Sequence, residues 1–421
     1  MDEIVNINGA NFIFSPFSNI ETASLGIFLQ IGSRFEKKNL KGISHFLEHM
    51  LFKGSKNYSY RQIKREIEGR GGSLNGFTSQ ETTAYYAHFL NKNLEFTLDI
   101  LLDMVNSPLL KKQDIAKERN VILEEIKMYN DLPSSRVAIL LDQLLWQGHP
   151  LGEEVIGYSS TVKKIDRFDL DNFRKRHYIP SRMVIVFSGN FSKERIISLL
   201  QSKVKKSNIK SNIKTTVPAA AHKLRIRTER KALEQSHLCL GFRSISYLSP
   251  QRLIGELINI ILGANMSSRL FEELREKKSL CYDISTEIRK YKDSGAFVIH
   301  TGLDKSKILV ATSTILRELN KLKEKEISAS ELVRAKDYSL GQIAMNLERP
   351  QGRMFYLAQE YLTQGKIEDF KTIKRKIESI TAQQIKQLAQ KIFKFENICI
   401  SCVGNIEETL EDKIRKAMSR E

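Results

Sequence analysis

The chain has 421 residues, of which 41% are hydrophobic and 28% are charged, with only 8 Pro and 22 Gly. This is the composition of a globular protein of roughly two or three domains, and it excludes a wholly disordered or collagen-like chain. The formal net charge is +18, which raises acidic partners as a possibility but carries no information about the fold.

The N-terminal residues are Met1-Asp2-Glu3-Ile4, without the basic and apolar stretches of a signal peptide or the Arg-rich character of a transit peptide. The sequence has no window of 18 consecutive apolar residues, so we expect no membrane span. These features together predict a cytoplasmic protein that does not bind membranes.

The predicted elements of the first half return in the same order in the second half. A strand at 24–30 matches 237–243, and a buried strand ending in a Gly turn at 182–191 matches 397–406. Gly189 and Gly404 in the second pair lie 215 positions apart. Two diverged copies of one domain explain this similarity.

Each copy combines strands with long amphipathic helices, such as 94–105 and 112–128 in the first. We predict an α+β fold of two homologous domains, each a mainly antiparallel sheet with helices packed on one face. The domains are placed at 1–205 and 223–421, joined by a polar linker at 206–222. Much of the positive charge lies at 203–231, which favours a solvated surface over an acid-binding site.

The chain has four cysteines, too few for a disulfide framework. Cys399 and Cys402 form a Cys-x-x-Cys pattern, but they lie inside an apolar run that is typical of a buried strand. Residues three apart in a strand point to opposite faces, roughly 10 Å apart at about 3.3 Å per residue, too far for a disulfide. We therefore interpret both as core residues.

A helix predicted after Gly42 carries His45, Glu48 and His49, which fall on one face. Two imidazoles one turn apart can share a zinc ion, and a neighbouring carboxylate can act on the water that the ion polarises. The order is that of the inverted His-x-x-Glu-His motif. The alternative interpretation is an ordinary solvated face of an amphipathic helix.

A catalytic zinc ion needs a third protein ligand. Glu118 and Glu125 lie seven residues apart on a predicted helix, so they project from nearly the same side, whereas Glu124 points about 100° away. Either of the first two carboxylates is a candidate ligand.

The chain resembles the pitrilysin/insulinase family of zinc peptidases, and within it the short two-domain group related to mitochondrial processing peptidase. The likeness runs over essentially the whole chain. The segments that carry it are 32–36, 42–54, 71–85, 118–126, 149–152 and 274–282.

This resemblance implies one zinc ion per chain, bound by His45, His49 and Glu125. It implies that Glu48 is the general base, taking a proton from the zinc-bound water, and that Glu118 is a supporting carboxylate of the catalytic site. The corresponding positions of the second half hold only apolar residues, namely Ile258, Ile261 and Leu262. The second domain is therefore expected to have no metal site.

Two further pairs are implied to bind substrate. Asn75 and Gly76 lie on an edge strand to which an extended peptide would add as a further strand. Arg275 and Tyr282 would grip the substrate backbone or the oxyanion, although the residues alone predict a surface Arg and a core Tyr. In the two-domain group, the second domain that grips the substrate usually belongs to a partner chain. The resemblance therefore implies a homodimer, or a heterodimer with a related inactive chain.

We therefore predict a zinc metalloendopeptidase whose partners are peptides or unfolded protein substrates. One alternative is a non-catalytic structural homologue of the same fold. A basic nucleic-acid-binding protein is the other, but the sequence shows no helix-turn-helix, RNP or zinc-finger signature.

Overall fold

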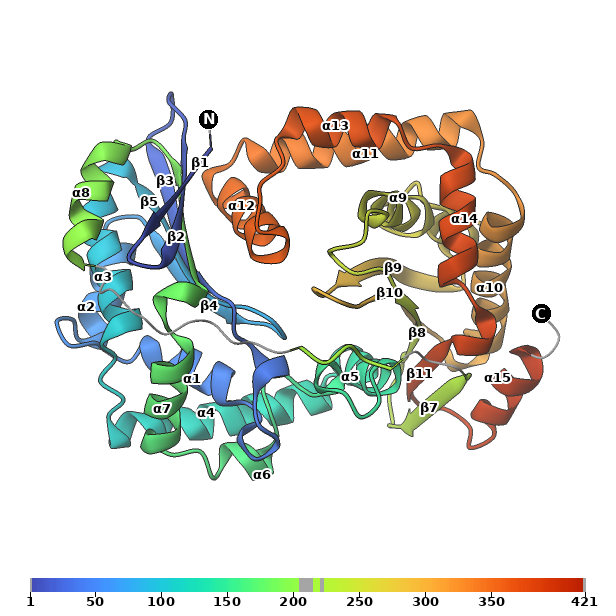
Figure 1. The fold of residues 1–421 in the computed structure, drawn as a ribbon. Coiled ribbons are helices and arrows are strands. Elements are labelled where there is room, and N and C mark those ends of the chain that lie inside the picture. Colours follow the sequence, from blue (N-terminus) through green and yellow to red (C-terminus); the bar gives the residue numbers. More distant parts are fainter. Residues whose placement is uncertain (1, 204–214, 220–222, 419–421) are drawn as a thin grey trace. The chain divides into compact units, whose positions relative to one another are not determined.

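The computed structural model describes residues 2–203, 215–219 and 223–418 (Figure 1). The chain divides into two compact units, each built around one β-sheet. The first unit consists of Met1–Lys127, Glu153–Thr215 and Met345–Ile367, and the second of Met128–Gly152, Thr216–Ala344 and Glu368–Glu421. The predicted α+β class with two similar domains is confirmed.

The sheet of the first unit has six strands in the order β1-β2-β6-β3-β5-β4. All neighbours are antiparallel except β2 and β6. The bounds are β1 (Glu3–Ile7), β2 (Ala10–Pro16), β3 (Thr22–Leu29), β4 (Ser73–Thr78), β5 (Thr83–Leu90) and β6 (Met183–Gly189). Strand β4 therefore lies at an edge of the sheet and pairs with β5 on one side.

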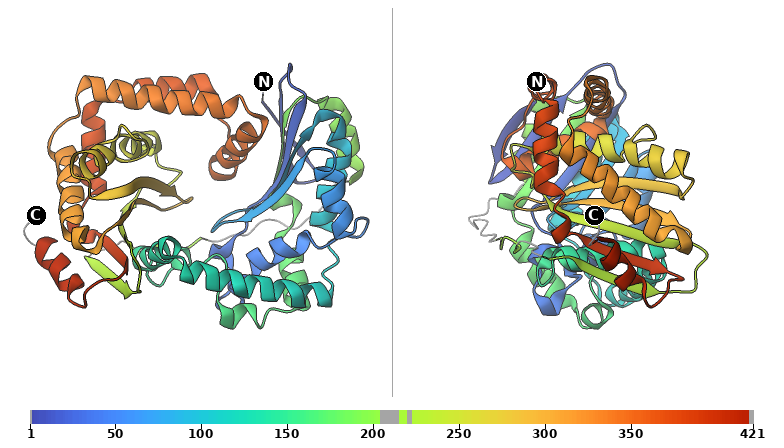
Figure 2. Two further views of the ribbon diagram at one scale, coloured as in Figure 1. Left: turned by 180° about the vertical axis from the view of Figure 1, so that it is seen from behind. Right: turned by 90° about the vertical axis from the view of Figure 1, so that its right-hand side faces the viewer.

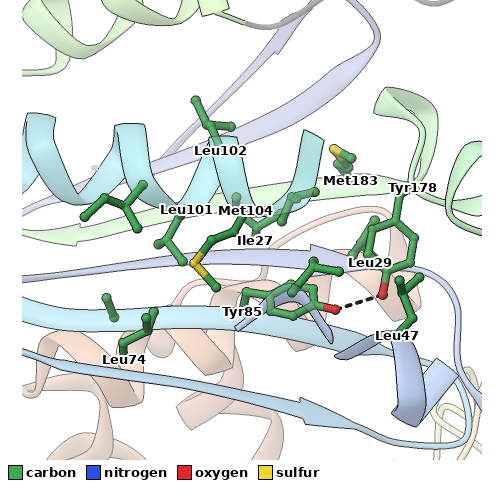
Figure 3. Packing of buried hydrophobic residues seen from close by; sticks show 14 of the residues in the cluster. Ile27, Leu29, Leu47, Leu74, Tyr85, Leu101, Leu102, Met104, Tyr178 and Met183 are labelled. Atoms are coloured by element: carbon green, nitrogen blue, oxygen red, sulfur yellow. Dashed lines mark hydrogen bonds between the residues drawn. The ribbon is translucent and has the colours of Figure 1, made fainter. Parts of the chain in front are cut away.

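Helices from the first half of the sequence cover one face of this sheet. Ile27, Leu29 and Tyr85 point from the strands into a core that also contains Leu47 and Met104 (Figure 3). The hydroxyl groups of Tyr85 and Tyr178 lie 2.9 Å apart inside it. The helices of this part are α1 (Ile43–Leu51), α2 (Tyr60–Glu68), α3 (Leu94–Asn106), α4 (Lys112–Asp131), α6 (Ser159–Val162), α7 (Arg167–His177) and α8 (Lys193–Lys203).

The opposite face of the first sheet is covered by a helix from the second half of the sequence. Helix α12 (Pro350–Gln364) places Met354 and Leu357 against Phe28 and Val186. The sequence predicted helices on one face only, and this second layer is an addition to that prediction.

The sheet of the second unit has the order β7-β11-β8-β10-β9, and only β7 and β11 pair in parallel among its described strands. The strands are β7 (Arg225–Arg230), β8 (Ser236–Ser244), β9 (Cys281–Lys290), β10 (Gly295–Leu303) and β11 (Cys399–Gly404). Phe393 packs edge-on against Phe242 and Phe297 on one face. Helices of this half are α9 (Arg252–Leu262), α10 (Ile308–Glu324), α11 (Ala329–Leu347), α13 (Phe370–Glu378), α14 (Ala382–Ile392) and α15 (Leu410–Met418).

The other face of the second sheet is covered by α5 (Pro133–Leu145), which comes from the first half. Leu140 and Leu141 pack there against Cys239 and Val298, and α5 lies against β8 and β11 (Figure 2, left). Each half of the sequence thus contributes one helix to the sheet of the other half. The compact units consequently differ from the predicted stretches 1–205 and 223–421. Of the predicted linker at 206–222, only residues 215–219 belong to the described part of the chain.

Cys399 and Cys402 are buried in β11, and all four cysteines are free thiols, which confirms their interpretation as core residues. Among the described residues, no helix combines the length and the apolar character needed to cross a bilayer.

Candidate active site

Helix α1 begins in a confined place. Gly42, just before it, has φ of 93°, and a Cβ atom here would lie 2.5 Å from the carbonyl oxygen of Ile156, so a side chain is excluded. The buried Glu36 carboxylate accepts hydrogen bonds from the backbone N–H groups of Gly42 (2.9 Å) and Ser44 (2.7 Å). Glu36 thereby caps the first turn of the helix and fixes its direction.

The polar face of α1 places two imidazoles side by side. The rings of His45 and His49 have centroids 4.6 Å apart. Across from them, Oε2 of Glu125 on α4 lies 3.9 Å from Nε2 of His45 and 3.7 Å from Nε2 of His49. Within the part of the chain that the structure describes, these three residues form the only group of His, Cys, Asp and Glu side chains spaced to hold a metal ion.

The residues fit a zinc ion. Two imidazoles and a carboxylate are a ligand set that catalytic zinc uses, and bonds of about 2.0–2.2 Å place tetrahedral ligands about 3.4 Å apart. Glu125 Oε2 is buried, yet it forms no hydrogen bond with any described residue. A buried carboxylate oxygen without a partner is costly, and an ion between it and the two imidazoles would satisfy it.

The surroundings shift the pKa values of the two imidazoles in opposite directions. Burial, helped by the neighbouring His49, lowers the pKa of His45 to about 3, so this ring is neutral at physiological pH. Burial acts to lower the pKa of His49 as well, but the hydrogen bond to Glu118 and the nearby carboxylates outweigh it and raise the pKa. The Nδ1–H of His49 donates to Oε2 of Glu118 at 3.2 Å, which leaves the lone pair of Nε2 facing Glu125.

Glu118 is therefore placed behind His49 and not among the three ligand atoms. Its Oε1 lies 2.5 Å from the Nζ of Lys53. Burial alone would raise the pKa of Glu118, but its bonds to His49 and Lys53 lower it. Glu124 points to solvent and pairs with Lys127 at 2.7 Å, which confirms the predicted separation of the two neighbouring glutamates.

Glu48 lies on α1, like the two histidines, and its side chain points toward the edge strand β4. It is 9% exposed, and burial raises the pKa of its carboxyl group. The hydroxyl group of Thr78 donates to its Oε2 at 3.0 Å, while Oε1 lies on the side of Gly76, 3.1 Å from where a Cβ atom of that residue would be. Asn75, one position earlier in β4, is exposed.

Arg275 and Tyr282 belong to the second unit, and the structure brings them together. Arg275 lies in a π-helix, η6 (Phe271–Lys277), an uncommon geometry that is frequent at functional sites. Its guanidinium carbon is 4.7 Å from the ring centroid of Phe271 and 4.9 Å from that of Tyr282.

The expectation of a core Tyr is wrong, because Tyr282 is 78% exposed. The register between β9 and β10 shifts between Gly302 and Leu303, and this irregularity leaves Tyr282 without a paired residue and turns it outward. The roles of Arg275 and Tyr282 toward the metal ligands remain a prediction.

Sequence reasoning missed three residues that support the site. Thr78 could have been found, because it shares the strand face of Gly76 two positions earlier. Lys53 could also have been found, because it lies four residues after His49, one helical turn away. Glu36 lies in the segment 32–36 that carries the resemblance, but its capping role had no local signal, since it reaches α1 from a preceding loop.

In the second unit, the positions that correspond to His45, Glu48 and His49 hold apolar side chains. Ile258, Ile261 and Leu262 on α9 are at most 4% exposed and form part of the core. That the chain has a single metal site, in the first half, stays a prediction.

Comparisons with known proteins match this picture. The family model "Insulinase (Peptidase family M16)" matches residues 14–159, and the model "Peptidase M16 inactive domain" matches residues 164–338. The chain is 32% identical to the uncharacterized zinc protease YmxG of Bacillus subtilis, over 92% of this chain and 94% of that protein. It is also 32% identical to an uncharacterized zinc protease of Rickettsia felis, over 92% and 93% of the two chains.

Two crystal structures share the fold. One is a protease from Helicobacter pylori, with a TM-score of 0.90, 22% identity and coverage of 96% of this chain and 99% of that one. The other, described as a peptidase M16 inactive domain from Pseudomonas fluorescens, has a TM-score of 0.88, 19% identity and coverage of 96% and 98%. On the evidence of the family models and of relatives matched over nearly their full length, the chain belongs to the M16 (insulinase) peptidase family.

Proposed function

We propose that the chain is a zinc-dependent metalloendopeptidase that hydrolyses peptide bonds in unfolded peptides or protein precursors. One observation carries this proposal. The buried Oε2 of Glu125, without a hydrogen-bond partner among the described residues, faces the Nε2 atoms of two histidines beside a buried glutamate, Glu48.

His45, His49 and Glu125 would hold the ion. When bound, zinc supplies a water molecule of lowered pKa and polarises the carbonyl group that is attacked. Glu48 takes a proton on its carboxylate and passes it to the nitrogen of the leaving amine. Thr78 occupies Oε2 of Glu48, so Oε1 is the atom left to accept the proton, and the pKa raised by burial suits a group that must hold it.

Strand β4 would bind the substrate by pairing with it. The other three edge strands of the described sheets each contain charged residues, which discourage strand addition: Glu3 in β1, four charges in Arg225–Arg230 and four in Cys281–Lys290. Strand β4 reads Ser-Leu-Asn-Gly-Phe-Thr and has none. A peptide paired with Asn75 and Gly76 would be held by main-chain hydrogen bonds next to Glu48.

The decisive test compares wild type with Glu48→Gln and the control Glu124→Gln, an exposed glutamate on α4. We expect kcat on unstructured peptides to fall about 10²–10⁴-fold in Glu48→Gln, the range of general-base catalysis, while one zinc ion per chain is retained. Glu124→Gln should behave as wild type. If wild type with one zinc per chain cleaves nothing in a diverse peptide library, the chain is a non-catalytic homologue.

We also propose that the active form is a dimer, of two copies or with a related inactive chain, in which Arg275 and Tyr282 act on substrate bound to the other subunit. The support is the exposed Tyr282 ring and the guanidinium held against it. Glu48→Gln chains mixed with Arg275→Ala chains should then regain activity as subunits exchange. Exchange without recovery would contradict action in trans.

A further inference from the structure

We propose that Lys53 is a positioning residue for the metal site, acting through Glu118 on His49. The proposal rests on the proposed zinc function, but its test measures metal binding and needs no peptide cleavage. Lys53 follows the end of α1, and its backbone N–H still donates to Met50 at 3.1 Å, so it continues the turn that carries His49.

The two oxygens of Glu118 are shared between two partners from the same stretch of chain. Oε2 accepts from Nδ1 of His49 at 3.2 Å, and Oε1 lies 2.5 Å from Nζ of Lys53. The Glu118 side chain is 9% exposed, so its carboxylate is largely shielded from water, and that of Lys53 is half-buried at 35% exposed. Because both oxygens are engaged, the carboxylate plane is fixed, and with it the plane of the imidazole.

Without Lys53 this arrangement would lose one of its two restraints. Glu118 would keep the bond to His49 alone, and its carboxylate could rotate about the bond to the side chain. Glu118 also projects from the same side of α4 as Glu125, two helical turns away, so a released carboxylate is free to compete with the ligand for the imidazole nitrogens. Partners that orient a metal-bound histidine typically contribute 10–100-fold to metal affinity.

The experiment measures the apparent Kd for zinc by competition with a chelator of known affinity. We expect Lys53→Met to weaken zinc binding about 10–30-fold and Lys53→Arg, which keeps the charge, to stay within about 3-fold of wild type. Lys56→Met is the control, because Lys56 is an exposed lysine three positions away. Thermal melts of the metal-free variants report whether each one folds.

A double-mutant cycle tests whether Lys53 acts through Glu118. In a Glu118→Gln background, Lys53→Met should add no more than about a 3-fold further loss of zinc affinity. The proposal is overturned if Lys53→Met binds zinc like Lys56→Met, or if its full effect persists in the Glu118→Gln background. A wild type that binds zinc tightly but cleaves no peptide would overturn the proposed function, while the zinc affinities of the Lys53 variants would still test the role of Lys53.

Discussion

Helices α1 and α9 occupy matching places in the two units, but the side chains at their corresponding positions are polar in α1 and apolar in α9. Helix α1 turns His45, Glu48 and His49 toward a polar cluster, whereas α9 fills the same positions with Ile258, Ile261 and Leu262. Because the second unit folds with apolar residues here, the fold itself does not require the polar cluster. A buried carboxylate oxygen without a hydrogen-bond partner, as on Glu125, destabilises a protein unless a ligand satisfies it, so its place beside the two imidazoles indicates function.

The two units are alike in a second respect, the helix that each receives from the other half of the sequence. Both α5 and α12 begin with Pro, and both carry an Arg three residues later. Arg136 donates to the carboxylate of Glu229 at 2.8 Å, and Arg353 donates to Asp2 at 2.8 Å and to the hydroxyl of Ser15 at 2.5 Å. In each unit, the helix that comes from the other half of the sequence is thus held by an Arg in its first turn. Neither core is complete within one half of the sequence.

The largest effect, loss of folding, should come from separating the two halves of the sequence, so that each sheet lacks the helix supplied by the other half. Produced separately, fragments 1–205 and 223–421 would each leave one apolar sheet face uncovered, including Phe28 and Val186 in the first. We expect neither fragment to unfold cooperatively or to stay soluble alone, and the two to associate when co-expressed. Circular dichroism and size-exclusion chromatography check this, and a monomeric, cooperatively folding fragment 1–205 would contradict it.

A smaller effect, confined to function, should follow from making α1 resemble α9. The triple variant His45→Ile, Glu48→Ile, His49→Leu should lose zinc and all peptide cleavage. Its unfolding free energy in the absence of metal should stay within about 2 kcal/mol of wild type, because apolar side chains replace buried polar ones while Glu118 and Thr78 each lose a partner. Denaturant titrations against metal-free wild type measure this, and a strongly destabilised variant would show that the polar face also supports the fold.

The sequence was sufficient for the parts of the site that depend on helical periodicity. His45, Glu48 and His49 share a face because of their spacing, and Glu118 and Glu125 share a side because they lie seven residues apart. It was insufficient where partners are chosen in three dimensions. An amphipathic pattern shows that α5 and α12 bury one side, but it does not show which sheet they cover, and the irregularity that exposes Tyr282 has no local signal.

The smallest effects should come from removing single threonine hydroxyl groups that join a helix to an edge strand in each unit. Thr78 on β4 donates to the carboxylate of Glu48, whereas Thr286 on β9 donates to the backbone carbonyl of Asn259 on α9 at 3.2 Å. We expect Thr78→Val to lower kcat about 10-fold, or about 1.4 kcal/mol, with KM and zinc content unchanged, and Thr78→Ser to restore it. Thr286→Val should leave kcat unchanged and lower the unfolding free energy by about 1 kcal/mol.

Kinetics and thermal melts of the three variants separate an orienting role from a structural one. If Thr78→Ser is as slow as Thr78→Val, the hydroxyl group does not orient Glu48, and the contact in the first unit is as structural as the Thr286 contact in the second. If kcat responds to Thr78 and only stability responds to Thr286, a threonine that links helix and edge strand serves catalysis in one unit and packing in the other.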